Sequence, residues 1–228
     1  MSPKQIVKEY LSRGGYRTVY RVYNALNLKN RRYIPKENRL VCDGTLLHNV
    51  DIRVQGTGNE IILHDRVNLT NCNIRIYGND NRILIGTHTS CNQTTFWMED
   101  NGNTITIGEH CCLTGKTELA AIEGTAITIG NRCLFSNHIT FRTGDSHSIV
   151  DMQGKRCNPS ESIAIHDHVW IGADVVCLKG MEIADGCVVG THSLVTKKFK
   201  EPNCIIAGSP AKLICRDKTW VGERLPLE

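Results

Sequence analysis

Hydrophobic residues in the C-terminal half of the chain recur at every sixth position. The series runs from Ile165 to Leu213 and is broken only at Glu201, and a second compact or apolar residue stands four positions after each member. Self-similarity at a fixed period is typical of repeat architectures. Two inward positions in every six predict short parallel strands, three of which make one triangular coil. The two series are Ile165, Ile171, Cys177, Ile183, Val189, Val195, Ala207 and Leu213, and Val169, Val175, Met181, Cys187, Ser193, Phe199, Ile205 and Ala211.

The preceding half repeats with a longer period. Gly86, Gly108 and Gly130 stand 22 residues apart, whereas Gly172 and Gly190 stand 18 apart. The four added residues of each coil are rich in Asn, Gly, Glu and Asp, which favour turns, so we expect them to widen one corner of every coil. The pattern predicts an all-β domain, a parallel β-helix over residues 40–216.

Two stretches of the chain lack this period. Residues 142–162 interrupt the coils, and long loops inserted into a rigid scaffold are usually functional. Residues 217–228 form a tail for which the pattern predicts no structure.

Residues 1–39 differ from the rest in charge and in period. They hold ten Lys and Arg against Glu9 and Glu37, while the whole chain is only +4. Ser2-Pro3 is typical of a helix start, and apolar residues at helical spacing on either side of Gly14-Gly15 predict two short helices. We expect this basic segment to cap the open end of the β-helix, with contact to an anionic membrane surface as a second interpretation.

The overall composition excludes several classes of protein. Aromatic residues make up only 6% of the chain, and no apolar run is long enough to span a bilayer. The eleven cysteines are expected to be reduced thiols, several at inward repeat positions. Without a signal-peptide pattern, we expect a cytoplasmic protein, peripheral at the inner membrane face if the basic segment binds lipid. No phosphate-loop or dinucleotide motif is present, and no nucleic-acid partner is expected.

The motifs of the C-terminal coils resemble those of a known family. They are His168-Val169-Trp170-Ile171-Gly172-Ala173, Gly190-Thr191-His192-Ser193-Leu194-Val195-Thr196-Lys197 and Ala207-Gly208-Ser209-Pro210-Ala211-Lys212. They resemble the hexapeptide-repeat acyltransferases, in particular the maltose/galactoside acetyltransferases and the capsular and lipopolysaccharide O-acetyltransferases. The resemblance implies a left-handed β-helix, acetyl-CoA as acyl donor, and a homotrimer with active sites between subunits.

His147 is the candidate catalytic base. It stands where the interrupting loop begins, 23 residues before Trp170, which is where the resembling enzymes carry their catalytic histidine. Imidazole exchanges protons near neutral pH, as abstraction of a hydroxyl proton requires. Asp145 is a candidate to orient the ring. Asp151 or a main-chain carbonyl are equal candidates.

The acyl-donor site is predicted on the coils that follow. Trp170 precedes an inward Ile and is expected to project outward, and the resemblance places it against the pantetheine arm. Stacked corner residues can donate N–H groups to a long ligand, and lysines can bind its phosphates. The repeat alone would also explain glycines at corners, and solvated surface lysines are the ordinary case. The candidate donor-binding residues are Trp170, Gly172, Ala173, Gly190, Thr191, Lys197 and Lys212.

The acceptor site departs from that of the simple sugar acetyltransferases. Their asparagine-rich segment is replaced here by Leu113–Glu118, which leaves Asn137 on the next coil as a candidate, and Ser148-Ile149 replaces their His-Pro. This variant is more similar to the polysaccharide O-acetyltransferases. Lys155 and Arg156 on the inserted loop are candidates to meet an extended or anionic glycan.

Three alternatives to O-acetylation of a surface-polysaccharide sugar or its precursor stay open. The same base and cleft could N-acetylate an amino sugar. The γ-class carbonic anhydrases share the fold and bind metal through three histidines, and His88 and His110 are expected to stack about 5 Å apart on successive coils. Their third ligand spacing is missing, so we predict no metal. A catalytically silent scaffold is the third alternative.

Overall fold

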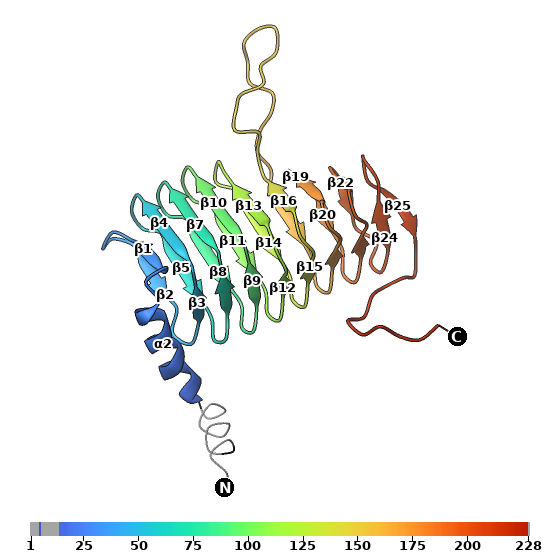
Figure 1. Cartoon of the computed structure of the whole chain (residues 1–228). Helices are drawn as coiled ribbons and strands as arrows, with labels where there is room; N and C mark the ends of the chain where they lie inside the picture. The colour runs from blue at the N-terminus through green and yellow to red at the C-terminus, as the bar shows by residue number, and fades with distance from the viewer. Residues whose placement is uncertain (1–4, 6–13, 228) are drawn as a thin grey trace.

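The computed structural model describes residue 5 and residues 14–227, and three parallel sheets make up almost all of it (Figure 1). Sheet A contains β1 (Arg31–Tyr33), β4 (Asp51–Gln55), β7 (Asn73–Tyr77), β10 (Thr95–Glu99), β13 (Thr117–Ala121), β16 (Ile139–Arg142), β19 (Val176–Leu178) and β22 (Leu194–Val195). Sheet B contains β2 (Arg39–Val41), β5 (Glu60–Leu63), β8 (Arg82–Ile85), β11 (Thr104–Ile107), β14 (Ala126–Ile129), β17 (Ile163–Ile165), β20 (Glu182–Ile183) and β23 (Lys198–Phe199). Sheet C contains β3 (Leu46–His48), β6 (Asn68–Thr70), β9 (Ser90–Asn92), β12 (Cys112–Leu113), β15 (Leu134–Phe135), β18 (Trp170–Ile171), β21 (Val188–Val189), β24 (Ile205–Ala207) and β25 (Lys212–Cys215).

The chain visits the three sheets in turn, which makes each circuit one coil of a parallel β-helix and confirms the predicted fold class. Each strand pairs in parallel register with the strand one coil later, as Phe96 does with Ile74 and Leu119. Among the strands of the described residues, β25 alone reverses, pairing antiparallel with β24.

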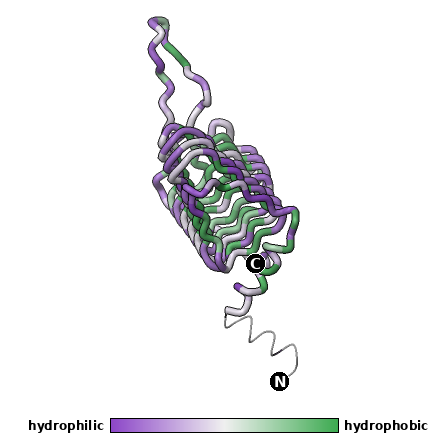
Figure 2. Tube along the Cα trace, turned by 90° about the vertical axis from the view of Figure 1, so that its left-hand side faces the viewer, coloured by the Kyte–Doolittle hydropathy of each residue, from purple (hydrophilic) through white to green (hydrophobic). Residues whose placement is uncertain are grey.

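The interior is filled by the predicted inward residues. In the strands between the two end coils, side chains that point inward are buried, and the largest rings, Phe96, Phe135 and Phe141, are fully enclosed. Figure 2 shows the hydrophobic positions alternating with hydrophilic ones along each coil. Because an inward position is flanked above and below by the equivalent position of the neighbouring coils, burial follows directly from the sequence period.

A ladder of buried asparagines stabilises the corner between sheets A and B in the 22-residue coils. Asn81 Oδ1 accepts from the main-chain N and the Nδ2 of Asn103, at 2.9 and 2.8 Å. Asn59 Oδ1 accepts in the same way from Asn81, and Asn38 Oδ1 from Asn59. The ladder ends at Thr125, whose hydroxyl bonds that of Thr143 at the base of the inserted loop.

The basic N-terminal segment caps the first coil with a helix, α2 (Tyr16–Leu26). Asn24 Oδ1 accepts from Leu47 N, and Asn24 Nδ2 donates to Thr45 O, so the helix satisfies main-chain groups at the sheet edge. The first of the two predicted helices lies outside the described residues. Membrane contact by this segment stays a prediction.

The first strand starts earlier than residue 40. β1 lies inside the segment that the sequence assigns to the helical cap, and it pairs with β4. All three of its residues are exposed, because the first strand at the open end has a neighbour on one side only. It therefore carries no apolar alternation that the sequence could reveal.

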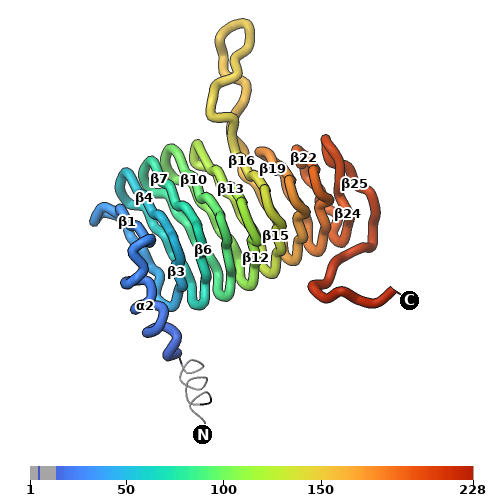
Figure 3. Tube along the Cα trace, viewed as in Figure 1, coloured from blue at the N-terminus to red at the C-terminus, as the bar shows by residue number. Residues whose placement is uncertain are grey.

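Two segments leave the body of the β-helix. Residues 143–162 connect β16 to β17 and project from the edge between sheets A and B. The tail after β25 turns back beneath the last coils (Figure 3). No helix among the described residues is long and apolar enough to cross a membrane.

Candidate active site

His147 lies at the mouth of a cavity on the outer face of sheet A. The cavity has a volume of about 520 Å³ and is lined by Thr95, Trp97, Glu99, Glu118, Ala120, Ile122, Arg142, Gly144, Ser146 and His147. The side chain of His147 is exposed, and its ring has no hydrogen-bond partner among the described residues. Both ring nitrogens are therefore free to contact a substrate.

Asn158 holds the main chain around His147. Its Nδ2 donates to His147 O at 2.8 Å, and its Oδ1 accepts from Ile149 N at 2.8 Å. The side chain is only 6% exposed although it comes from the inserted loop. A buried amide that bonds both strands of a loop fixes their separation, so Asn158 positions the backbone that carries the histidine. The sequence gives no signal for Asn158, because nothing in its local sequence distinguishes it from a solvated loop residue.

Asp145 binds groups other than the histidine ring. Its carboxylate accepts from Lys179 Nζ and, at 2.9 Å, from Asn158 Nδ2. These hydrogen bonds, with Lys179 the stronger influence, lower the pKa of the Asp145 carboxyl below its ordinary value. Orientation of His147 by Asp145 stays a prediction, and the observed arrangement instead ties the loop to the turn between β19 and β20.

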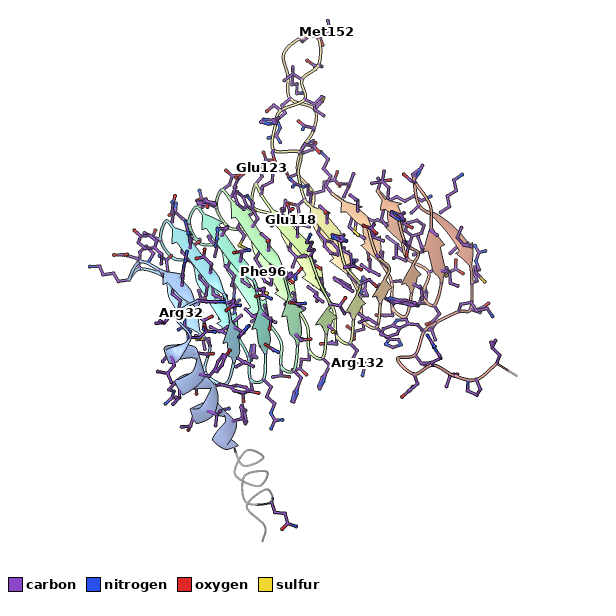
Figure 4. The ribbon with its side chains drawn as sticks, in the orientation of Figure 1. Arg32, Phe96, Glu118, Glu123, Arg132 and Met152 are labelled. Atoms are coloured by element: carbon purple, nitrogen blue, oxygen red, sulfur yellow. The ribbon has the colours of Figure 1, made fainter. Side chains whose placement is uncertain are left out.

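Arg156 anchors the inserted loop to the coil beneath it. Its guanidinium makes a bidentate ion pair with Glu123, with Nη1–Oε1 and Nη2–Oε2 distances of 2.6 and 3.0 Å. Glu123 also accepts from Ser160 Oγ at 2.8 Å. In Figure 4, Glu123 lies at the base of the loop and Met152 at its tip. Arg156 is thus engaged within the protein, Lys155 is exposed, and glycan binding by either residue stays a prediction.

The floor of the cavity has an aromatic and an ionic part. The Trp97 ring contacts that of Tyr77 one coil earlier, with centroids 5.2 Å apart. Arg142 donates to Glu118 Oε1 at 2.7 Å across the neighbouring strands. Trp97 and Arg142 stand on one outward file of sheet A, since Trp97 pairs with Ala120 and Ala120 with Arg142. The signal that marks Trp170, an aromatic ring at an outward repeat position, would also have identified Trp97.

Trp170 lies on the outer face of sheet C. Its side chain projects outward as predicted, with 37% of the residue exposed. Its register partners are Leu134 on β15 and Val188 on β21, which gives the face an apolar strip. Next to this strip the chain is closely packed: a Cβ added to Gly172 would lie 2.8 Å from Thr191 N. The glycine is therefore required by the coil geometry whether or not a ligand binds.

The tail provides a second tryptophan at this face. The Trp220 ring stacks on that of His168 with centroids 4.5 Å apart and lies 6.2 Å from the Trp170 ring. The sequence pattern offered no signal for this contact, because the tail has no period.

The other predicted residues are distributed over different parts of the β-helix. Asn137, Ala173 and Thr191 lie in turns that lead from sheet C to sheet A. Lys197 lies in a turn from sheet A to sheet B, with its ammonium 5.3 Å from the Phe199 ring centre. Lys212 opens β25 at the end of sheet C, opposite Ala207.

The predicted site residues therefore fall on separate edges of one chain. The inserted loop with His147 projects from the edge between sheets A and B. Trp170 is the first residue of β18 in sheet C, beyond the next corner. In Figure 4, Arg132, which precedes β15 on that same far corner, lies opposite the loop. The intervening width is that of one strand of sheet B, roughly 10–15 Å. His147 and Trp170 thus do not meet on a single continuous face.

The histidines form no metal centre in the part of the chain that the structure describes. The rings of His88 and His110 are stacked with centroids 4.9 Å apart, which confirms their predicted spacing. His166 binds Glu182, and His168 faces Trp220. No group of three or more His, Cys, Asp or Glu is arranged to hold a metal ion among these residues.

Comparison with known proteins identifies acetyltransferases that are similar to this chain. The chain is 29% identical to a polysialic acid O-acetyltransferase of known crystal structure, with a TM-score of 0.66 over 86% of this chain and 92% of that one. It is 32% identical over 88 residues to the polysialic acid O-acetyltransferase of Escherichia coli O1:K1, covering 38% of this chain and 28% of that protein. It is 43% identical over 56 residues to a chloramphenicol acetyltransferase of Agrobacterium fabrum, covering 25% and 26% of the two chains. No protein-family model matches.

The chain resembles acetyltransferases, among them polysialic acid and lipopolysaccharide O-acetyltransferases, and it shares the parallel β-helix fold of the polysialic acid O-acetyltransferases of known structure. The aligned segments span only about a quarter of the length of the curated relatives named above.

Proposed function

We propose that this protein is an O-acetyltransferase that transfers the acetyl group of acetyl-CoA to a sugar hydroxyl of a surface polysaccharide or its precursor. The observation that carries the proposal is the exposed His147 at the mouth of the sheet A cavity, with its main chain held by Asn158. A base for hydroxyl activation must be reachable by the acceptor and fixed in place. His147 meets both requirements.

The transfer proceeds in one displacement. The imidazole of His147 takes the proton of the acceptor hydroxyl while the oxygen attacks the thioester carbonyl carbon. The carbon–sulfur bond then breaks, the acetyl ester remains on the sugar, and the leaving thiolate takes the proton from the imidazolium. The step is balanced without a covalent acyl-enzyme.

The active site is completed by a second copy of the chain. His147 and Trp170 lie on different edges of one β-helix, so a ligand that contacts both must lie between two subunits. In a closed ring every subunit offers its loop edge to the sheet C face of its neighbour. A homotrimer satisfies this geometry and has three equivalent sites.

The acceptor is a carbohydrate that lies on sheet A. Trp97 and Tyr77 offer aromatic faces next to the ion pair of Glu118 with Arg142, a combination suited to a sugar ring with its apolar face and its hydroxyl rim. The polysialic acid O-acetyltransferase that aligns over 92% of its length supports a polymeric acceptor. The chloramphenicol acetyltransferase resembles this chain only over a short segment. It therefore gives weaker support to a small hydroxylated acceptor than the polysialic acid O-acetyltransferase gives to a polymeric one.

The test is acceptor-dependent release of CoA from acetyl-CoA, followed with a CoA-specific readout because the protein has eleven cysteines of its own. Polysialic acid, extracted surface glycans and chloramphenicol serve as acceptors. We expect release with a glycan and its loss in His147→Ala, while His64→Ala, an exposed histidine on the turn after β5, retains activity. Equal activity of His147→Ala and wild type would contradict the assignment of the base. Activity with chloramphenicol alone would contradict the polysaccharide acceptor.

The scaffold alternative is tested by CoA binding. A ligand that binds only the folded protein raises its melting temperature by mass action. We expect CoA to raise the melting temperature of this protein, whereas a non-catalytic scaffold would show no change.

A further inference from the structure

We propose that the C-terminal segment 216–220 is part of the acyl-donor site, and that Trp220 and Trp170 together form the apolar wall for the pantetheine arm of acetyl-CoA. The inference rests on the proposed function and adds to it a residue outside the repeat. It assigns a role to the non-periodic tail.

The segment is tied to the β-helix along its length. Arg216 Nε donates to Glu201 Oε1, and Lys218 N donates to Asn203 O, both at 2.8 Å. The chain then passes Gly186, where an added Cβ would lie 2.2 Å from Asn203 Oδ1 and 3.3 Å from Thr219 Oγ1. The tail therefore follows the corner between sheets B and C back toward the coil of Trp170.

Trp220 is docked by reciprocal contacts with His168. Its Nε1 donates to His168 O at 2.8 Å, and His168 Nε2 bonds Trp220 O at 3.0 Å. The two rings stack with an interplanar angle of 12°. Two hydrogen bonds and a stacked ring hold the indole in one orientation, as a binding surface that is formed before its ligand arrives requires.

The docked indole extends the surface of Trp170. The two indole planes meet at 52°, with centroids 6.2 Å apart. Leu134 and Val188 lie on either side of Trp170 in the same file of sheet C. Two large rings and two aliphatic side chains form a continuous apolar surface, and such a surface on a soluble protein is usually covered by a ligand or a partner.

The chemistry of this surface fits the pantetheine arm. That arm is a flexible, mostly aliphatic chain with two amides, and it binds best along an apolar wall with polar main-chain groups at its border. Lys218 is exposed two residues before Trp220, and its ammonium is available for the phosphates at the far end of CoA. Arg216 is engaged by Glu201. Packing of Trp220 against a neighbouring subunit without ligand contact is the competing interpretation.

The experiment measures CoA binding by calorimetry to the full chain. We expect Trp220→Ala to raise the Kd of CoA about tenfold or more and to raise the KM for acetyl-CoA, with the KM for the acceptor unchanged. Leu225→Ala is the matched control, because it removes an exposed apolar side chain from the same tail and should leave the Kd unchanged. Light scattering and melting temperature verify that Trp220→Ala keeps its oligomeric state and fold.

A fluorescence titration separates ligand contact from a packing role. CoA should quench the indole emission of the wild type, and Trp220→Phe, which retains a ring to stack on His168, should lose the part of the quenching that comes from position 220. A Kd for Trp220→Ala within twofold of wild type, or unchanged quenching in Trp220→Phe, would overturn the inference alone. Loss of affinity together with dissociation of the oligomer would overturn it in favour of subunit packing. A wild type that binds no CoA would overturn the proposed function as well.

Discussion

The side-chain amide of Asn158 donates to the main-chain carbonyl of His147 at 2.8 Å, across a loop that separates the two residues by eleven positions. The same amide group reaches Asp145 Oδ2 and Ile149 N. Its Oδ1 also accepts from Arg156 Nε at 3.1 Å, so one buried side chain bonds the proposed base and three residues near it. The position of His147 depends on a residue that takes no part in proton transfer.

Removal of this amide should impair turnover more than donor binding. We expect Asn158→Ala to lower kcat about 10- to 100-fold, the range in which misplacement of a reacting group by ~1 Å is felt, and to leave the KM for acetyl-CoA within about twofold. Steady-state kinetics with both substrates varied give the two values. Asn158→Asp retains an acceptor for Ile149 N but loses both donors and places a second carboxylate against Asp145, so its kcat should fall at least as far as that of Asn158→Ala. A parallel loss of CoA affinity would contradict a local positioning role.

The ion pair between Glu123 and Arg156 should make the inserted loop sensitive to acid. The hydrogen bond from Arg156, with a further one from Ser160, lowers the pKa of Glu123 in the folded protein. A carboxyl whose pKa is depressed by folding stabilises the folded state at pH values above its ordinary pKa. That contribution is lost as the pH falls through the pKa of the folded state. We expect amide hydrogen exchange in residues 143–160 to increase below about pH 4 relative to the coils.

Glu123→Gln provides the control for that prediction. It keeps the shape of the side chain and removes its charge, so the loop should exchange faster at neutral pH and show little further change on acidification. Equal loop exchange in wild type and variant over the whole pH range would contradict the anchoring role of the pair.

The asparagine ladder should contribute a large share of the stability of the 22-residue coils. Asn81→Ala leaves the main-chain N and the Nδ2 of Asn103 without their acceptor, and Asp100 O without its donor. Each buried group left unpaired costs about 1–3 kcal/mol, so we expect a loss of about 3–5 kcal/mol in the free energy of unfolding. Urea denaturation measures it. Asn79→Ala, at an exposed position in the same turn, should cost less than half as much.

A site shared between subunits should be recoverable from two inactive variants. In a closed trimer each site takes His147 from one copy and Trp170 from the next. Co-expression of His147→Ala with Trp170→Ala in equal amounts then leaves about one site in four with both residues intact. We expect the co-expressed population to regain roughly a quarter of wild-type activity at low acetyl-CoA, where each variant alone is inactive. No recovery from trimers shown to be mixed would place both residues in the site of a single chain.

Much of the fold could be predicted because the contacts of a β-helix are periodic. Phe96 packs between Ile74 and Leu119 for the same reason that every inward residue has neighbours one coil away. A separation of 18 or 22 residues along the chain corresponds to one strand spacing in space. The same repetition revealed the outward Trp170 as an exception, and the position of His147 followed from the point where repetition stops together with the family resemblance.

The sequence by itself therefore determined the coils, their buried residues, the place of the interruption and the candidate base. The tertiary structure decided how the non-periodic segments fold back: Asn158 onto His147, Arg156 onto Glu123, and Trp220 onto His168 across 52 residues. It also placed His147 and Trp170 on different edges of the chain. Each of these contacts occurs only once and involves a segment without a repeat. The sequence therefore contains no periodic pattern from which they could be predicted. Each depends on the path a loop or tail takes over a surface that exists only after the coils have formed.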